Sequence, residues 1–131
     1  MTVVKLGILI FLKEESFLLE NYLGKEVVVK VDRPLGSKHP TYNYIYPLNY
    51  GYIPGTKAAD GEEVDAYILG GEAHSLDQYK GIVIGIVRRK NDIEDKLIVS
   101  NKSFSLEEIK QAVHFQEQYF NTEIIMNRGF L

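Results

Sequence analysis

An acidic segment at residues 60–65, with the sequence DGEEVD, carries the side chains of this chain best suited to chemistry. It places four carboxylates directly before an apolar run at residues 66–69. Because a strand entry fixes the direction of the backbone, side chains two or three residues apart can converge on one point. Converging carboxylates repel one another unless a cation neutralises them, and hard oxygen ligands select Mg²⁺, Mn²⁺ or Ca²⁺. The segment therefore predicts a divalent metal site, with a solvated acidic turn as the alternative.

A second polar loop, residues 32–40, contains groups suited to binding an anion. Arg33, Lys38 and His39 are cationic or can become so. The Gly-Ser pair at residues 36–37 can present backbone N–H groups to an anion. A plain solvent-exposed loop explains the same composition equally well. The residues of this loop predicted to contact the anion are Arg33 and Lys38.

Composition limits the classes of protein to which these residues can belong. The 131 residues include 45% hydrophobic side chains, which suits one domain with a single core. A formal net charge of -3, without a basic block, argues against a nucleic-acid partner. The absence of cysteine excludes disulfides, thiolate zinc sites and a cysteine nucleophile. Any metal must be bound by oxygen atoms or by the three histidines.

The apolar run at residues 6–12 is the one stretch that resembles a targeting segment. It is shorter than the ~20 residues that span a bilayer. No small-residue cleavage site follows it, since bulky residues occur at 17–19. We read it as the start of a buried strand or helix, and expect a cytoplasmic protein without a membrane partner. The expected organisation is one domain over residues 1–131, with 1–24 as an N-terminal extension and 25–120 as the core.

Apolar periodicity predicts the elements that must position the polar residues. A short helix is expected at 15–23, and strands at 26–32, 64–69, 81–88 and 96–100. Residues 42–52 hold five tyrosines around Pro47 and do not read as an ordinary strand. Ser105 and Glu108 form a capping-box signal for an amphipathic helix at 105–120. Its predicted apolar face consists of Leu106, Ile109, Val113 and Phe120. This order predicts an α+β fold, a small and mostly antiparallel β-barrel with a C-terminal amphipathic helix packed on it.

Two adjoining motifs resemble the signature of family I soluble inorganic pyrophosphatases. Residues 46–54 read YPLNYGYIP and precede the acidic segment by a few residues. In that family a Tyr-Pro-x-Asn-Tyr-Gly-Tyr/Phe-Ile segment precedes an Asp-Gly-Asp-Pro-x-Asp motif in the same order. The likeness extends more loosely from residue 25 to residue 119. It implies an OB-like barrel and Mg²⁺-dependent hydrolysis of pyrophosphate to two phosphates, with Mn²⁺ as an alternative metal.

The resemblance assigns roles to individual residues of the two motifs. Asp60 and Asp65 match metal ligands, with Asp65 at the position that bridges two magnesium ions. Glu62 matches the aspartate that orients or deprotonates the attacking water, although its side chain is one methylene longer. Tyr50 matches a tyrosine that lines the active site, and Tyr46 is a weaker match.

The segment 91–96, NDIEDK, resembles a further family cluster of two aspartates and a lysine at the end of a strand hairpin, here with shorter spacing. In an extended strand Asp92, Glu94 and Lys96 share one face, and Asp95 lies on the other. A turn before Lys96 would instead let Asp95 act as the ligand. Glu94 and Asp95 therefore both stay open as metal ligands beside Asp92, with Lys96 as a phosphate contact. A charged hairpin tip is the alternative without a metal.

Several basic residues of the family's phosphate clamp are replaced in this chain. The C-terminal segment resembles a family segment that ends in a Tyr-Lys pair. It keeps Tyr119 as a candidate phosphate contact, but Phe120 occupies the lysine position. A lysine and a glutamate on an early family strand correspond to Val28 and Lys30, and a family arginine falls on Lys38. The basic loop after this strand is predicted to supply the missing charge.

These assignments predict a hydrolase that attacks inorganic pyrophosphate with a metal-activated water. One alternative is a related hydrolase acting on nucleotide phosphoanhydrides. Another is a metal- and phosphate-binding module that has lost hydrolysis, which the replaced lysines favour. Family members are commonly oligomers, which leaves a homo-oligomer open for this chain.

Overall fold

The computed structural model describes residues 19–71, 74–91 and 93–127. The apolar run at 6–12, residues 15–18 of the expected helix, and Asp92 lie outside these ranges, whereas residues 19–21 of that helix are helical and residues 22–24 form a turn. Within them, no helix is long and apolar enough to cross a bilayer. The described elements, in chain order, are β1 (Glu26–Arg33), β2 (Tyr50–Ile53), β3 (Val64–Ile68), β4 (Gln78–Arg89), β5 (Lys96–Ser100), α2 (Leu106–Glu117) and β6 (Thr122–Met126).

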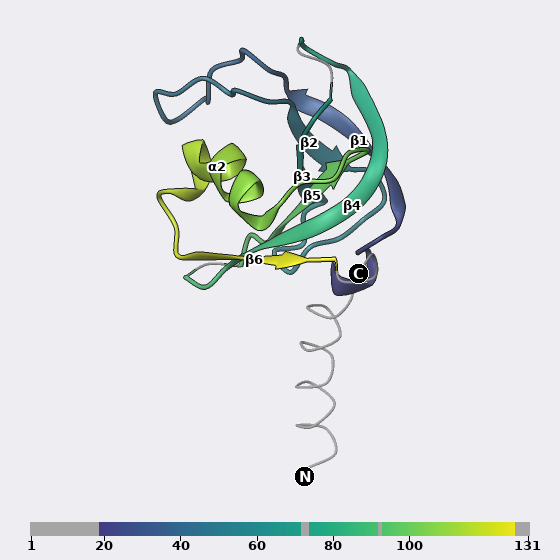
Figure 1. Cartoon of the computed structure of the whole chain (residues 1–131). Helices are drawn as coiled ribbons and strands as arrows, with labels where there is room; N and C mark the ends of the chain where they lie inside the picture. Colours follow the sequence, from purple (N-terminus) through teal and green to yellow (C-terminus); the bar gives the residue numbers. More distant parts are fainter. Residues whose placement is uncertain (1–18, 72–73, 92, 128–131) are drawn as a thin grey trace.

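Five strands close into a barrel in the order β1-β2-β3-β5-β4, because β4 pairs back with β1. Neighbouring strands run antiparallel except β3 and β5, which run parallel. The 12-residue β4 curves around the barrel (Figure 1) and also pairs with β6. With α2 packed beside these strands, the predicted α+β barrel is confirmed.

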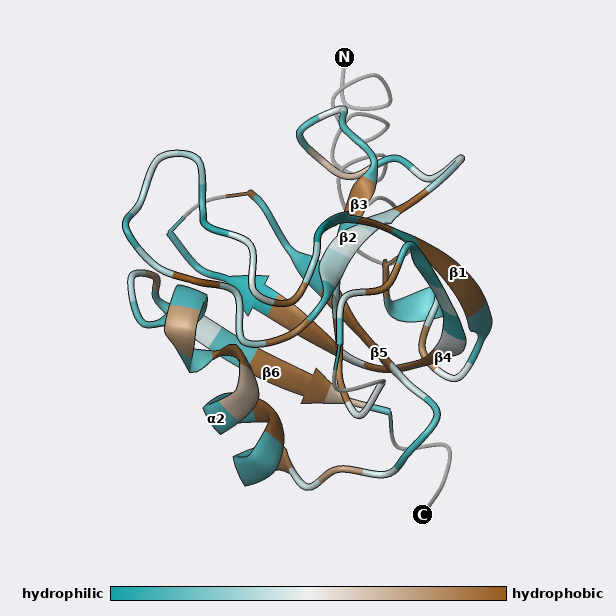
Figure 2. Cartoon of the chain, turned by 90° about the horizontal axis from the view of Figure 1, so that it is seen from above, coloured by the Kyte–Doolittle hydropathy of each residue, from teal (hydrophilic) through white to brown (hydrophobic). Residues whose placement is uncertain are grey.

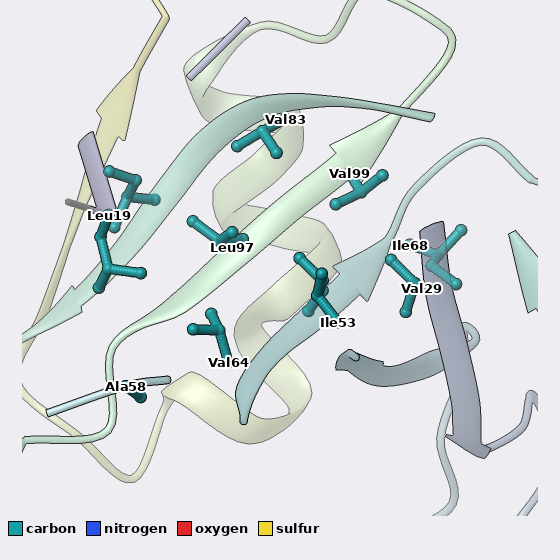
Figure 3. Packing of buried hydrophobic residues seen from close by; sticks show 11 residues of the cluster. Leu19, Val29, Ile53, Ala58, Val64, Ile68, Val83, Leu97 and Val99 are labelled. Carbon is teal, nitrogen blue, oxygen red and sulfur yellow. The ribbon is translucent and has the colours of Figure 1, made fainter. Parts of the chain in front are cut away.

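The core consists of two apolar clusters, one on each face of β5. Leu97 and Val99 pack with β1, β2 and β3 residues in the first cluster (Figure 3), whereas Ile98 lies in the second cluster with Ile109 and Val113 of α2. Successive side chains of a strand point to opposite faces, and every residue of β5 is buried, so both faces of β5 are covered. This burial accounts for the continuous apolar run at residues 97–99. Figure 2 shows this distribution, with apolar colour on the strands and hydrophilic colour on much of the loops.

Four of the observed strands confirm the sequence predictions, with β5 matching its predicted bounds. The expectation that the tyrosine-rich segment lacks an ordinary strand is wrong for β2. A Cβ atom at Gly51 would lie 1.9 Å from the carbonyl oxygen of Lys30, so only glycine lets β2 approach β1 this closely. The strand therefore depends on a contact between segments that periodicity does not reveal. The last strand, β6, was not predicted either.

The helix α2 begins as predicted and ends earlier. Ser105 caps it, and both hydrogen bonds of the capping box with Glu108 are present. The helix stops at Glu117, and Leu106 is 40% exposed, so the predicted apolar face is wrong at Leu106 and Phe120. The buried face continues instead with Gln116 and Glu117, because both side chains find hydrogen-bond partners inside the fold.

Candidate active site

A pocket of about 340 Å³ lies between the barrel, the β1–β2 loop (residues 34–49) and the C-terminal end of α2. Figure 1 shows that loop, in slate blue, on the side of the barrel where α2 is found. Six of the residues predicted to serve a site meet in the lining of this pocket. They are Arg33, Tyr50, Asp65, Glu94, Lys96 and Tyr119. Asp60, Glu62, Asp95 and Lys38 do not line it.

The barrel brings these residues together because several of its strands begin or end at the pocket. Arg33 closes β1 and is the register partner of Tyr50, which opens β2. Lys96 opens β5, whose parallel neighbour β3 carries Asp65. The β1–β2 loop is anchored by Asn49, whose buried side-chain oxygen accepts the backbone N–H groups of residues 35 and 76.

Asp65 is the best-organised carboxylate of the pocket. Its Oδ2 accepts hydrogen bonds from the Tyr50 hydroxyl at 2.9 Å and from Lys96 Nζ at 3.1 Å. The Lys96 side chain is only 3% exposed, whereas that of Asp65 is 40% exposed. Burial and the charge of Asp65 raise the pKa of Tyr50 well above its ordinary value, so this phenol stays a neutral donor. The carboxylate is thus held in one orientation while it remains accessible.

Asp32 lines the same pocket as Asp65, and the negative charges of the two carboxylates repel each other. Burial raises the pKa of Asp32, the negative charge of Asp65 raises it further, and Arg33 offsets part of the effect. Two carboxylates under such mutual repulsion form a favourable place for a cation. Asp32 was predicted to end a strand, but it was given no role in the site because it belongs to neither motif.

Arginines balance the carboxylates that follow β4. Glu94 Oε2 lies 3.3 Å from Nη1 of Arg89. Asp95 accepts the backbone N–H of Arg89 at 3.0 Å, and its other oxygen lies 3.6 Å from Nε of Arg88. Of the two alternatives left open by the sequence, Glu94 lines the pocket and Asp95 does not. Their predicted role as metal ligands stays a prediction.

The acidic segment splits between the pocket and the solvent. Asp60 and Glu62 are exposed, and Oδ1 of Asp60 accepts the backbone N–H of Glu62 at 2.9 Å in a tight turn. Only Asp65, which lies on β3, reaches the pocket. Over residues 19–71, 74–91 and 93–127, no three acidic or histidine side chains form a group that could hold a metal ion. The roles of Asp60 and Glu62 stay predictions.

A buried polar network lies where the pocket meets α2. Arg89 donates from Nε and Nη2 to the two oxygens of Glu117, at 3.0 and 2.8 Å, and its guanidinium stacks on the ring of Phe120 at 3.6 Å. The hydroxyls of Tyr67 and Thr122 also donate to Glu117. Burial raises the pKa of Glu117, but these hydrogen bonds outweigh it and leave the pKa lowered. Glu117 is therefore an anion at neutral pH.

The network was not predicted, although one signal for it exists. Gln116 and Glu117 follow Val113 at three and four residues, so they share its buried face of the helix. Polar residues at such positions need partners, because burying an unpaired polar group is costly. Gln116 finds them in the hydroxyls of Tyr44, Tyr46 and Tyr67.

Sequence comparison decides the family. The chain matches the family described as inorganic pyrophosphatase over residues 21–125. This chain belongs to the inorganic pyrophosphatase family. The members of that family are hydrolases, and the resemblance stated from the two motifs is confirmed.

Known relatives of this pyrophosphatase-family chain agree with that result. An inorganic pyrophosphatase of Sulfolobus acidocaldarius is 33% identical, over 89% of this chain and 75% of the relative. One from Methanosarcina acetivorans is 31% identical, over 78% of this chain and 67% of the relative.

Solved structures of other pyrophosphatases share the fold at low identity. The enzyme of Ehrlichia chaffeensis superposes with a TM-score of 0.62 at 18% identity, covering 80% of this chain and 88% of that one. The enzyme of Thermus thermophilus gives 0.60 at 16% identity, with 79% and 84% covered. These neighbours identify the barrel of this pyrophosphatase-family chain as the family's OB-like fold.

Proposed function

We propose that this chain hydrolyses inorganic pyrophosphate in the pocket at the end of the barrel, in a reaction that depends on Mg²⁺. The observation that carries the proposal is the meeting of Asp65 and Tyr50, from the two family motifs, with three further candidate phosphate contacts in one pocket. Those contacts are Arg33, Lys96 and Tyr119. A cytoplasmic location and homo-oligomerisation stay predictions.

The reaction needs a nucleophile, charge neutralisation and a leaving group. A water oxygen would attack one phosphorus, the bridging P–O bond would break, and two phosphates would leave with the protons of the water shared between them. Arg33 and Lys96 would neutralise charge on the phosphate oxygens, and the hydroxyl of Tyr119 would donate to them. Two donors hold Asp65 in one orientation, which would help to position the reacting groups.

The donors of the pocket fit a metal ion that arrives with the substrate. Mg²⁺ is commonly bound by one or two carboxylates together with substrate phosphates and water. Asp65 and Asp32 would supply those carboxylates, whereas Glu94 already forms an ion pair with Arg89. A bound Mg²⁺ would make the attacking water more acidic and neutralise phosphate charge. Glu62, proposed from the resemblance to orient this water, lies in an exposed turn outside the pocket lining.

Purified protein is expected to release phosphate from pyrophosphate when Mg²⁺ is present, because the pocket lacks the charge to neutralise pyrophosphate alone. Removing the metal with a chelator should abolish the release, and adding it back should restore it. Phosphate release is measured colorimetrically, with Mn²⁺ as a parallel condition. If neither metal raises the release above the metal-free control, the hydrolase proposal is wrong.

The second candidate function is binding of pyrophosphate without hydrolysis. The ion pairs between Arg89 and two glutamates favour it. Arg89 forms ion pairs with Glu94 and Glu117, so part of the negative charge of Glu94, which lines the pocket, is already compensated without a metal. In this case the pocket would bind pyrophosphate and leave it intact. Calorimetric binding of pyrophosphate without any phosphate release would support this function over hydrolysis.

Arg33→Ala is expected to lower kcat/KM for pyrophosphate on the order of 100-fold, because a cation beside the transferring phosphate stabilises charge in the transition state. Lys38→Ala should cost less, since Lys38 is exposed, bridges to Ile45 and does not line the pocket. Steady-state kinetics of both variants test this order, with circular dichroism as the check on folding. A larger loss in Lys38→Ala would assign the phosphate contact to Lys38 instead.

A further inference from the structure

The mouth of the pocket carries more aromatic surface than hydrolysis of pyrophosphate needs, because only the hydroxyl of Tyr119 takes part in the proposed reaction. Tyr42 is 56% exposed and Tyr119 is 61% exposed, and both line the pocket together with Tyr44. The inner part differs, because Arg89 and Lys96 are almost fully buried there. The pocket is thus charged inside and aromatic outside. A small, strongly hydrated anion gains nothing from such a mouth.

The three tyrosine rings form a platform. Their planes differ by only 8 to 15°, and the centroid separations are 6.2 Å for Tyr42–Tyr44, 6.1 Å for Tyr42–Tyr119 and 6.2 Å for Tyr44–Tyr119. In a column the two outer rings would lie about twice as far apart as neighbours, so equal separations exclude that arrangement. The three near-parallel rings are instead offset from one another, with their centroids at the corners of a triangle. Tyr42 and Tyr119, which are exposed, offer aromatic surface beside the phosphate contacts.

The platform is fixed by contacts on its inner side. The hydroxyl of Tyr44 donates to Gln116 at 2.9 Å, and the ring of Phe115 meets Tyr44 edge-on at 78°. Nδ1 of His39 accepts the backbone N–H groups of Thr41 and Tyr42, both at 3.0 Å, which folds the loop under the rings. A surface organised before binding costs little ordering entropy when a ligand stacks on it.

A planar heterocycle joined to a chain of phosphates matches both parts of the pocket. We propose that the pocket takes a nucleoside di- or triphosphate, with its phosphates on the inner charged residues and its base stacked on Tyr42 and Tyr119. The assignment of the phosphates to the inner charged residues rests on the proposed function. Stacking suits any base, because every base has a π-face. The pocket volume of about 340 Å³ lies within the range of roughly 300–1,000 Å³ typical of sites for ligands larger than pyrophosphate.

The test compares two ligands that share a P–C–P group which hydrolysis cannot cleave. They are methylenediphosphonate and α,β-methylene adenosine diphosphate, and calorimetry in the presence of Mg²⁺ gives the Kd of each. The wild-type chain is expected to bind the adenosine ligand more tightly. Tyr42→Ala should weaken that ligand roughly 10-fold and methylenediphosphonate much less. Tyr42→Phe keeps the ring and should keep the affinity.

Ile45→Ala is the matched control, because Ile45 is 55% exposed in the same loop and does not line the pocket. Its ratio of the two Kd values should equal that of the wild type. Equal affinities of the wild type for both ligands, or equal losses in Tyr42→Ala, would overturn the inference and leave pyrophosphate hydrolysis untouched. The expected ratio in a protein that releases no phosphate from pyrophosphate would instead support the inference and contradict the hydrolysis.

Discussion

Replacing Asp65 by asparagine is expected to lower the rate of phosphate release at least about 100-fold. The carboxylate lines the pocket and accepts hydrogen bonds from Tyr50 and Lys96. An amide of the same shape keeps the volume but supplies no charge to a metal ion or to the buried ammonium of Lys96. The rate is measured as phosphate release at saturating Mg²⁺, with the metal titrated to detect weaker metal binding.

The asparagine variant should still fold. Asp65 is 40% exposed, so the lost charge pair is partly screened and we expect a loss of about 1–3 kcal/mol in unfolding free energy. Glu123→Gln is the control, because Glu123 is half exposed and lies on β6, 3.9 Å from Lys90 and outside the pocket lining. A near-normal rate in folded Asp65→Asn would show that Asp65 is not at the reaction centre.

Glu117→Ala is expected to lower the unfolding free energy by about 3–5 kcal/mol, because it leaves the buried guanidinium of Arg89 without its main partner. Arg89 and Glu117 have side chains 2% and 5% exposed and are joined by two short hydrogen bonds. Urea unfolding at pH 7 measures the loss. Combining Arg89→Met with Glu117→Leu should cost less than the sum of the two single substitutions, since neither charge then stays buried alone. Strict additivity would show that the pair is not coupled.

The pH dependence of Glu117→Gln gives a second measure of the same pair. The pKa of Glu117 is lowered below its ordinary value of 4.5, so its ionised form stabilises the fold fully above that value. The contribution is lost as the pH falls through the lowered pKa of the folded state. The difference in unfolding free energy between wild type and Glu117→Gln should therefore be constant from neutral pH down to about 5 and shrink below it. A difference that grows on acidification would contradict the assigned charge.

Local sequence predicted the strands that depend on their own residues. The run KLIVS at 96–100 is apolar enough to be buried on both faces, and it forms β5 with the predicted bounds. Strand β2 could not be predicted in this way, because its place next to β1 depends on Gly51 lying against the backbone of Lys30. A contact between two segments does not produce a periodic pattern of apolar residues in either segment. The prediction for the end of α2 failed for a similar reason, because the buried Glu117 depends on hydrogen-bond partners on other elements.

Site residues that belong to a sequence motif could be predicted. Site residues that depend on pairing with a residue far away in the sequence could not. Asp65, Tyr50, Lys96 and Tyr119 were proposed from the family resemblance and meet in one pocket. Arg89 was not proposed, because its partner Glu117 lies 28 positions away and the position of Glu117 on the buried helix face does not reveal which residue pairs with it. Phe120 was assigned to the core from helical spacing. It packs on Arg89 instead, because the helix ends before the spacing would place it in the core.

The pairing of β1 with β4 has a consequence for how the chain is made. Its register joins residues 26–30 to residues 78–82, and β5 lies between β3 and β4, so the barrel closes only after residue 100 has been made. Until β4 has been made, the backbone groups of residues 26–30 that pair with it lack their partners. Such an edge is a template for pairing with other chains. During synthesis, at about 5–20 residues per second, β1 is therefore exposed for several seconds. Nascent β1 is the segment on which we expect a ribosome-associated chaperone to act.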